Sequence, residues 1–146
     1  MKKYQNLEHT ADLKIRAFGQ TKEEVFVNMA VGMFENICDK KAVLKDQPVK
    51  REIKVKANDL PGLLVEFLNE LVTLIDINNE IYTDYRLQIS RLRSSSSGGQ
   101  ADYRLQGVIR GYKVKGLKMD VKAVTYNELK IEEKKGKWAA EVVFDI

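Results

Sequence analysis

Two segments of the chain place hydrophobic residues three or four positions apart, which is the spacing of an amphipathic helix. The first begins after Thr21, which forms a capping box with Glu24, and ends near Cys38. The second follows Asn58 and Asp59, which can cap a helix, and contains Pro61 where a first helical turn tolerates proline. Each helix therefore has an apolar face that other parts of the chain must cover.

The remaining segments alternate hydrophobic and polar residues, which indicates strands. Residues 11–18 and 49–57 alternate in this way, and four further strands are expected at Ile81–Leu92, Ala101–Gly111, Val121–Ile131 and Trp138–Ile146. Ser94–Gly99 predicts a mobile hairpin loop without chemistry. This order predicts an α+β fold, a single domain over residues 1–146 in which two amphipathic helices pack on one face of a mixed or antiparallel β-sheet.

Composition narrows the class of protein. A chain of 146 residues can bury a self-supporting core. The single cysteine, Cys38, excludes an intrachain disulfide and a zinc cluster of thiolates, and it favours a reducing compartment. No apolar stretch reaches 18 residues, and the N-terminus does not resemble a signal peptide. We therefore expect a cytoplasmic protein that does not contact a membrane.

Basic residues are concentrated late in the chain. The net charge is +4, and the segment from Arg104 to Lys122 carries six basic side chains against one acidic side chain, Asp120. Such a segment could contact RNA phosphates or a protein partner, through Arg110, Lys113, Lys115 and Lys118. Alternating Lys and Arg are also typical of a solvated sheet face, which is the alternative interpretation. Glycine-rich phosphate loops do not occur in the sequence.

The only histidine lies in a polar run, Glu8 to Asp12, just before the first expected strand. A histidine near a carboxylate is often structural, so His9 has a structural and a functional interpretation. A Ser-His-Asp hydrolase would have to use His9, but no G-x-S-x-G elbow accompanies it.

The C-terminus is unusual because residues 142–146 are mostly apolar and β-forming up to the end of the chain. A docked final strand would fix the side chain of Asp145 beside the main-chain carboxylate of Ile146, and two such negative groups repel unless a cation compensates. If Asp12 approached the same point, three carboxylates would form a site suited to Ca²⁺, Mg²⁺ or Mn²⁺ rather than Zn²⁺. An exposed strand end is the alternative, and spacing alone does not decide between them.

Five short motifs occur in order along nearly the whole chain. They are HTAD at 9–12, GMF at 32–34, LLVEFLNEL at 63–71, VKAVTY at 121–126, and the terminal Asp145-Ile146. Each motif alone is weakly specific, but together they resemble the archease family. The resemblance implies a small α+β protein that is not an enzyme but a cofactor of the RtcB-type tRNA-splicing ligase.

That ligase joins a 2′,3′-cyclic phosphate or 3′-phosphate RNA end to a 5′-hydroxyl, using GTP and Mn²⁺ through a guanylylated histidine. The resemblance implies that the chain speeds guanylylation and supports repeated turnover, with tRNA or other RNA met directly or through the ligase. It also implies a divalent-metal site at Asp12, Asp145 and Ile146, with His9 and Thr125 as neighbours that could orient the ligands.

Two points remain open within the resemblance. Archeases have also been connected with a tRNA cytosine-5 methyltransferase, so a chaperone or an RNA-binding modulator is the alternative function. Many members have a histidine directly after the VKAVTY-like segment, where this chain has Asn127, and many have a longer connection than Tyr112–Asp120 with a histidine in it. Roles of those histidines do not carry over to this chain.

Overall fold

The computed structural model describes residues 2–93 and 101–146. Apart from an additional first strand and a short 3-10 helix, its elements follow the predicted order of strands and helices, and the predicted α+β class is confirmed. They are β1 (Tyr4–Leu7), β2 (Leu13–Gly19), α1 (Lys22–Ile37), a short 3-10 helix (Lys40–Ala42), β3 (Val43–Ala57), α2 (Leu60–Asn78), β4 (Glu80–Arg93), β5 (Ala101–Val114), β6 (Ala123–Lys134) and β7 (Lys137–Asp145). The loop predicted at Ser94–Gly99 lies outside the described residues.

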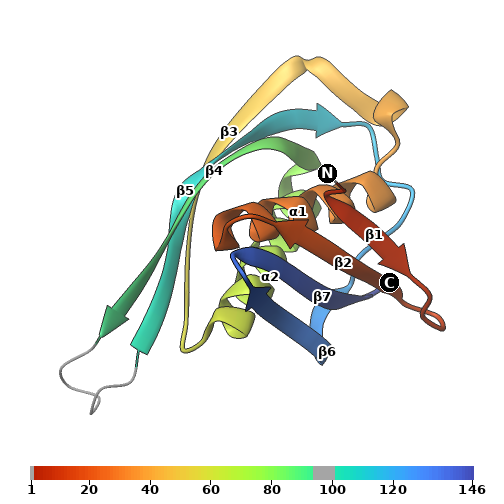
Figure 1. Cartoon of the computed structure of the whole chain (residues 1–146). Helices are drawn as coiled ribbons and strands as arrows, with labels where there is room; N and C mark the ends of the chain where they lie inside the picture. The colour runs from red at the N-terminus through yellow and green to blue at the C-terminus, as the bar shows by residue number, and fades with distance from the viewer. Residues whose placement is uncertain (1, 94–100) are drawn as a thin grey trace.

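The strands form two antiparallel sheets rather than the single sheet expected from the sequence. One has the order β1-β2-β7-β6 and the other the order β3-β5-β4. The helices lie between them: α1 packs on β2 and β4, and α2 packs on β3 and β6 (Figure 1). Val65 and Val72 are buried although they lie off the predicted stripe of α2, because α2 is covered on more than one side. The predicted packing of two helices on antiparallel sheet structure is confirmed, but the helices lie between two sheets and not on one face of a single sheet.

Both helix starts are held by the predicted side chains. The Thr21 hydroxyl accepts a hydrogen bond from the Glu24 backbone N–H at 3.0 Å, and the Asp59 carboxylate accepts one from the Gly62 N–H at 2.7 Å. Such caps satisfy backbone donors that a helix leaves unpaired, and each stabilises by roughly 1 kcal/mol. Helix α2 ends at Asn79, whose left-handed φ of 54° turns the chain directly into β4.

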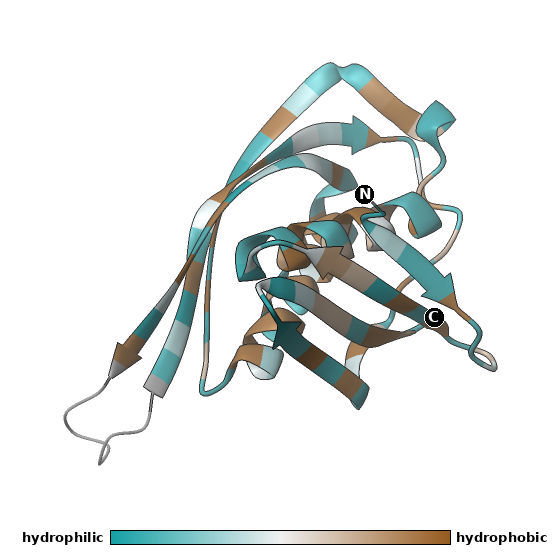
Figure 2. Cartoon of the chain, in the orientation of Figure 1, coloured by the Kyte–Doolittle hydropathy of each residue, from teal (hydrophilic) through white to brown (hydrophobic). Residues whose placement is uncertain are grey.

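The core fills the space between the layers, where the hydrophobic positions of both helices and both sheets meet (Figure 2). Aromatic pairs connect the elements: the ring centroids of Phe26 and Phe67 are 5.8 Å apart, as are those of Phe34 and Tyr82. Burying each such side chain stabilises the fold by roughly 1.5–3 kcal/mol. Neither helix is long and apolar enough to span a bilayer within the described residues.

Strand β1, which the alternation did not predict, fixes the loop that carries the candidate site residues. The missing side chain of Gly32 makes room for the Tyr4 ring, because a Cβ there would lie 2.9 Å from it. The side-chain amides of Asn6 and Asn36 also exchange hydrogen bonds of 2.9 and 3.0 Å. The β1–β2 hairpin is therefore attached to α1, and residues 8–12 connect its two strands.

Candidate metal centre

Pairing of β2 with β7 brings Asp12 to the C-terminal end of the chain. In this antiparallel pair Leu13 lies opposite Phe144, so the next step of the register leads to Asp12 on one strand and Asp145 on the other. Figure 1 shows the C-terminus beside the connection between β1 and β2. Sequence spacing alone could not show whether Asp12 and the C-terminus approach each other. Their approach is a consequence of the pairing of β2 with β7.

The end of β7 is held in place rather than frayed. Phe144 is fully buried, and Asp145 pairs with Ala123 of β6. The backbone N–H of Lys122 donates a 2.8 Å hydrogen bond to the Asp145 carbonyl. Asp145 and Ile146 are half-buried, and the Ile146 side chain packs against the core. The last two residues are therefore held against the sheet and the core.

If the alternation of β2 and β7 extends one residue beyond the Leu13–Phe144 pair, Asp12 and Asp145 point to the same side of the sheet. Leu13 and Phe144 face the core, and successive side chains of a strand alternate between faces. Among residues 2–93 and 101–146, no three His, Cys, Asp or Glu side chains are grouped for a metal ion. The predicted centre has only two side-chain ligands, so it depends on the Ile146 carboxylate as its third. Such an all-oxygen set fits Ca²⁺, Mg²⁺ or Mn²⁺.

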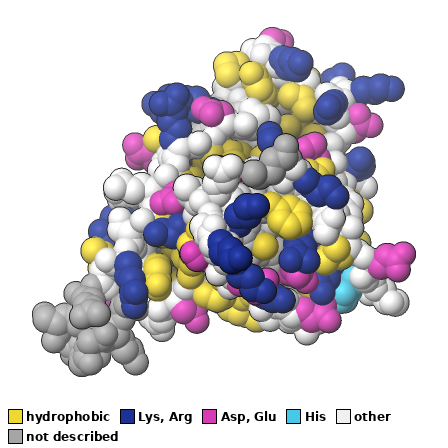
Figure 3. Space-filling view, viewed as in Figure 1, with side chains coloured by type: hydrophobic (Ala, Val, Ile, Leu, Met, Phe, Trp, Pro, Cys, Tyr) yellow, Lys and Arg dark blue, Asp and Glu magenta, His cyan; other side chains and the backbone are white. Residues whose placement is uncertain are grey.

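The ring of His9 lies between Asp12 and Glu128. Its Nδ1 is 3.5 Å from an Asp12 oxygen, and its Nε2 is 3.0 Å from a Glu128 oxygen. A neutral imidazole donates from one nitrogen only, so donation to Glu128 leaves the lone pair of Nδ1 facing a carboxylate. This Nδ1 is buried and has no hydrogen-bond partner. A cation shared with Asp12 would relieve that contact. The single histidine, cyan in Figure 3, is flanked by acidic side chains at the surface.

The basic side chains of β2 are already paired with glutamates. Lys14 Nζ lies 3.2 Å from Glu128 and 3.5 Å from Glu141, and Arg16 Nε lies 3.8 Å from Glu141. The hydrogen bond from Lys14 lowers the pKa of Glu128, and the same bond raises the pKa of Lys14. In the described part of the chain, no Lys or Arg forms an ion pair with Asp12 or Asp145. The donor set therefore fits a divalent cation, which would supply the missing positive charge.

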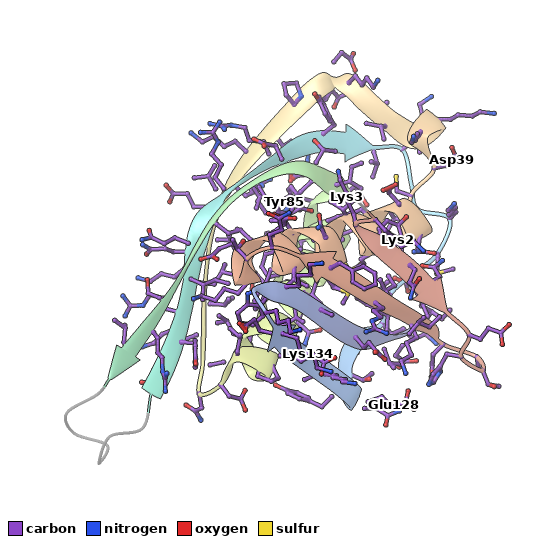
Figure 4. The ribbon with its side chains drawn as sticks, viewed as in Figure 1. Lys2, Lys3, Asp39, Tyr85, Glu128 and Lys134 are labelled. Atoms are coloured by element: carbon purple, nitrogen blue, oxygen red, sulfur yellow. The ribbon has the colours of Figure 1, made fainter. Side chains whose placement is uncertain are left out.

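Sequence reasoning missed Glu128, which reaches His9 because β6 contains a large bulge. Residues 126–129 of β6 stand opposite a single residue of β7, and Glu128 has a left-handed φ of 57°. Glu128 lies at the same edge of the molecule as the C-terminus (Figures 1 and 4). Thr125 is the last paired residue before the bulge, and its hydroxyl donates to the Val143 carbonyl at 3.2 Å. Thr125 thus joins β6 to β7 close to the candidate centre.

The predicted RNA-contact residues are divided among three places. Arg110 lies on the outer face of the β3-β5-β4 sheet, 3.7 Å from Asp84. Lys113 is turned toward Glu80, at 3.4 Å, and donates to the Asn78 carbonyl at 3.0 Å. Lys115 and Lys118 are exposed in the connection between β5 and β6. The late basic segment is therefore not a single surface.

The chain was compared with known protein families and structures. The model of the Archease protein family (MTH1598/TM1083) matches residues 4–146. Protein archease of Methanosarcina barkeri is 39% identical over 99% of this chain and 97% of its own length, and that of Thermococcus gammatolerans is 34% identical over the full length of both.

Among solved structures, Methanobacterium thermoautotrophicum protein 1598 superposes with a TM-score of 0.76 at 28% identity, over the whole of both chains. A crystal structure described as an archease and possible chaperone, from Thermotoga maritima, has the same fold, with a TM-score of 0.65 at 21% identity over 96% of this chain and 94% of that one. The family match and the close relatives both cover nearly the whole sequence. This chain belongs to the archease family.

Proposed function

We propose that this protein is an activating partner of an RtcB-type RNA ligase rather than an enzyme, and that Asp12, Asp145 and the carboxylate of Ile146 hold a divalent cation used in that role. The observation that carries the proposal is the register of β2 with β7, which leads Asp12 and Asp145 to the same end of the paired strands without a Lys or Arg counter-ion among the described residues. Family membership supports the link to RNA ligation.

The residues around the candidate centre have separable roles in this proposal. Asp12 and Asp145 bind the cation, and the carboxylate of Ile146 is the third ligand. Burial of Phe144 supports this role, because it holds the end of β7 against the core. His9 lies against the Asp12 carboxylate through Nδ1 and is itself held by Glu128. Once bound, a divalent cation supplies positive charge against the charge that develops at phosphoryl groups, or orders the ligase site during guanylylation.

A guanylylation assay with purified ligase, GTP and Mn²⁺ tests the proposal. We expect this protein to increase the rate of ligase guanylylation and the number of turnovers. Asp12→Ala and Asp145→Ala should remove the stimulation while circular dichroism shows an unchanged fold. Asp46→Ala, at an exposed carboxylate on β3, is the matched control and should stimulate fully. Full stimulation by both Asp12→Ala and Asp145→Ala would contradict the proposed mechanism.

A second candidate function is a chaperone or RNA-binding modulator of a tRNA cytosine-5 methyltransferase. The description of the Thermotoga maritima archease as a possible chaperone favours it. Binding of tRNA that is sensitive to salt but unaffected by chelators would support this function, whereas metal-dependent stimulation of the ligase supports the first. We place either function in the cytoplasm, where the thiol of Cys38 stays reduced.

A further inference from the structure

The β3-β5-β4 sheet has one face against the helices and an opposite face that no described element covers (Figure 1). Residues directly opposite each other in antiparallel strands point to the same side, so the register defines this outer face row by row. Four rows cross all three strands: Lys50, Arg110 and Asp84; Glu52, Val108 and Arg86; Lys54, Gln106 and Gln88; Lys56, Arg104 and Ser90. We call these twelve positions the outer basic face.

The outer basic face carries six basic and two acidic side chains. Its surplus of four positive charges equals the net charge of the whole chain, so the rest of the chain is electrically balanced. Within the described ranges, its only ion pair is Arg110 with Asp84, at 3.7 Å. Past the end of β3, the next pair on this face is Asp102 of β5 with Leu92 of β4. The basic surface ends at this pair. In Figure 3, Lys and Arg side chains stand along the left margin, where the three strands lie.

The middle of this face is hollowed. A cavity of about 640 Å³ lies there, lined among others by Lys54, Arg86, Gln88 and Gln106. The strands approach closely at this point because Gly107 has no side chain: a Cβ would collide with the Arg86 carbonyl oxygen. Glu52 and Val108 also line it, so the hollow combines two cations and one carboxylate with two amide groups that can donate or accept hydrogen bonds.

We propose that the outer basic face binds the sugar–phosphate backbone of double-helical RNA. Protein interfaces depend on apolar and aromatic anchors, and Val108 is the one apolar side chain among the twelve positions. Single-stranded nucleic acid is bound on aromatic stacking platforms, which the twelve positions lack. Cations and amides without aromatic residues suit contacts to phosphates and 2′-hydroxyls of a helix. The choice of RNA over DNA rests on the proposed function.

Fluorescence anisotropy with a labelled RNA hairpin of about 16 base pairs tests this inference. The combined variant Lys54→Gln, Lys56→Gln and Arg86→Gln neutralises three bases of the face. We expect its Kd to rise about tenfold or more, and the slope of log K against log salt to become less steep by about 2.7, because each of three lost phosphate contacts removes about 0.9. The matched control neutralises three exposed bases of the other sheet, Lys134→Gln, Lys135→Gln and Lys137→Gln, and should change Kd less than about twofold.

Three results would overturn the inference. The first is a wild-type protein that does not bind the hairpin at about 50 mM salt. The second is an equal loss of affinity in the control variant, which would indicate general attraction rather than this face. The third is binding to a competing partner. Equal affinity for a DNA hairpin would assign the face to DNA, and displacement of RNA by polyglutamate at equal charge would assign it to an acidic protein.

Ligase guanylylation needs no RNA, so it separates this inference from the proposed function. The face variant should stimulate guanylylation as wild type does, and Asp145→Ala should bind the hairpin as wild type does. Absence of guanylylation stimulation by the wild-type protein would refute the proposed function, and loss of hairpin affinity in Asp145→Ala would refute a separate RNA surface.

Discussion

His9 Nε2 lies 3.0 Å from a Glu128 carboxylate oxygen, although 119 positions separate the two residues in the chain. This contact joins the loop before β2 to the bulge of β6. Because the other ring nitrogen of His9 faces Asp12 at 3.5 Å, Glu128 fixes the orientation of the histidine relative to a proposed metal ligand. Partners of this kind, which touch a ligand rather than the ion, commonly tune metal affinity.

Replacing Glu128 by Gln should weaken binding of Mn²⁺ or Ca²⁺ about tenfold, because the histidine ring loses its charged acceptor. Isothermal titration calorimetry measures the affinity directly. Glu133→Gln, an exposed position on the same strand, is the control and should bind the cation as wild type does. If wild type, Glu128→Gln and Glu133→Gln bind the cation with equal affinity, Glu128 does not tune the candidate centre.

A fully buried carboxylate, Glu80, should be important for stability. It accepts hydrogen bonds from Arg51 and from the Tyr82 hydroxyl, and Lys113 lies 3.4 Å away. Glu80→Gln leaves the shape but removes the charge, so Arg51 and Lys113 lose their partner. Since the Arg51 and Lys113 side chains are partly in water, we expect the free energy of unfolding at pH 7 to fall by about 3 kcal/mol, which is near the lower end of the cost of breaking a buried ion pair. Urea denaturation measures this loss.

The same substitution should change the acid dependence of stability. Burial would raise the pKa of Glu80, but the hydrogen bonds from Arg51 and Tyr82 outweigh it and hold the pKa below its ordinary value of 4.5. A lowered folded pKa means that the ionised group stabilises the fold above 4.5 and loses that effect as the pH falls through the folded value. The difference in unfolding free energy between wild type and Glu80→Gln should therefore shrink in acid. A difference that stays constant down to acid unfolding would contradict this reasoning.

Gly32→Ala should loosen the β1–β2 hairpin. The added Cβ would lie 2.9 Å from the Tyr4 ring and 3.2 Å from Ile15. Overpacking of this kind costs about 1–3 kcal/mol, despite the better helix propensity of alanine. Faster amide hydrogen exchange in residues 4–7, with α2 unaffected, is the expected signature. Ala30→Gly, in the same helix, would lower stability through backbone freedom and cavity formation without pressing on Tyr4, and it should not produce this local pattern.

Features set by local patterns were predictable from the sequence. The caps at Thr21 and Asp59 follow from side chains close to the backbone groups that they bind, and the C-terminal strands follow from alternation. Strand β1 was missed because its four residues alternate weakly and are held by tertiary contacts such as Tyr4 on Gly32. The second sheet was missed because Val65 and Val72, which are buried off the predicted stripe of α2, belong in the sequence to one continuous hydrophobic run. Such a run does not show that a second layer covers the helix.

The candidate site was predictable only in its residue types. Asp12, Asp145 and Ile146 were identified by chemistry and by the family resemblance, but their approach depends on strand register, which spacing does not encode. Glu128 depends on a bulge, and the inward direction of Lys113 depends on the buried charge of Glu80. Their use in metal or RNA binding stays a prediction.

The central claim is that oxygen ligands from both ends of the chain share one divalent cation. Titration of Mn²⁺ or Ca²⁺ into the metal-free protein, followed by calorimetry, tests it most directly. We predict one cation per chain, with binding abolished in Asp145→Ala and strongly weakened when two residues are added after Ile146, because the extension converts the terminal carboxylate into a neutral amide. Unchanged affinity in both proteins would contradict the claim.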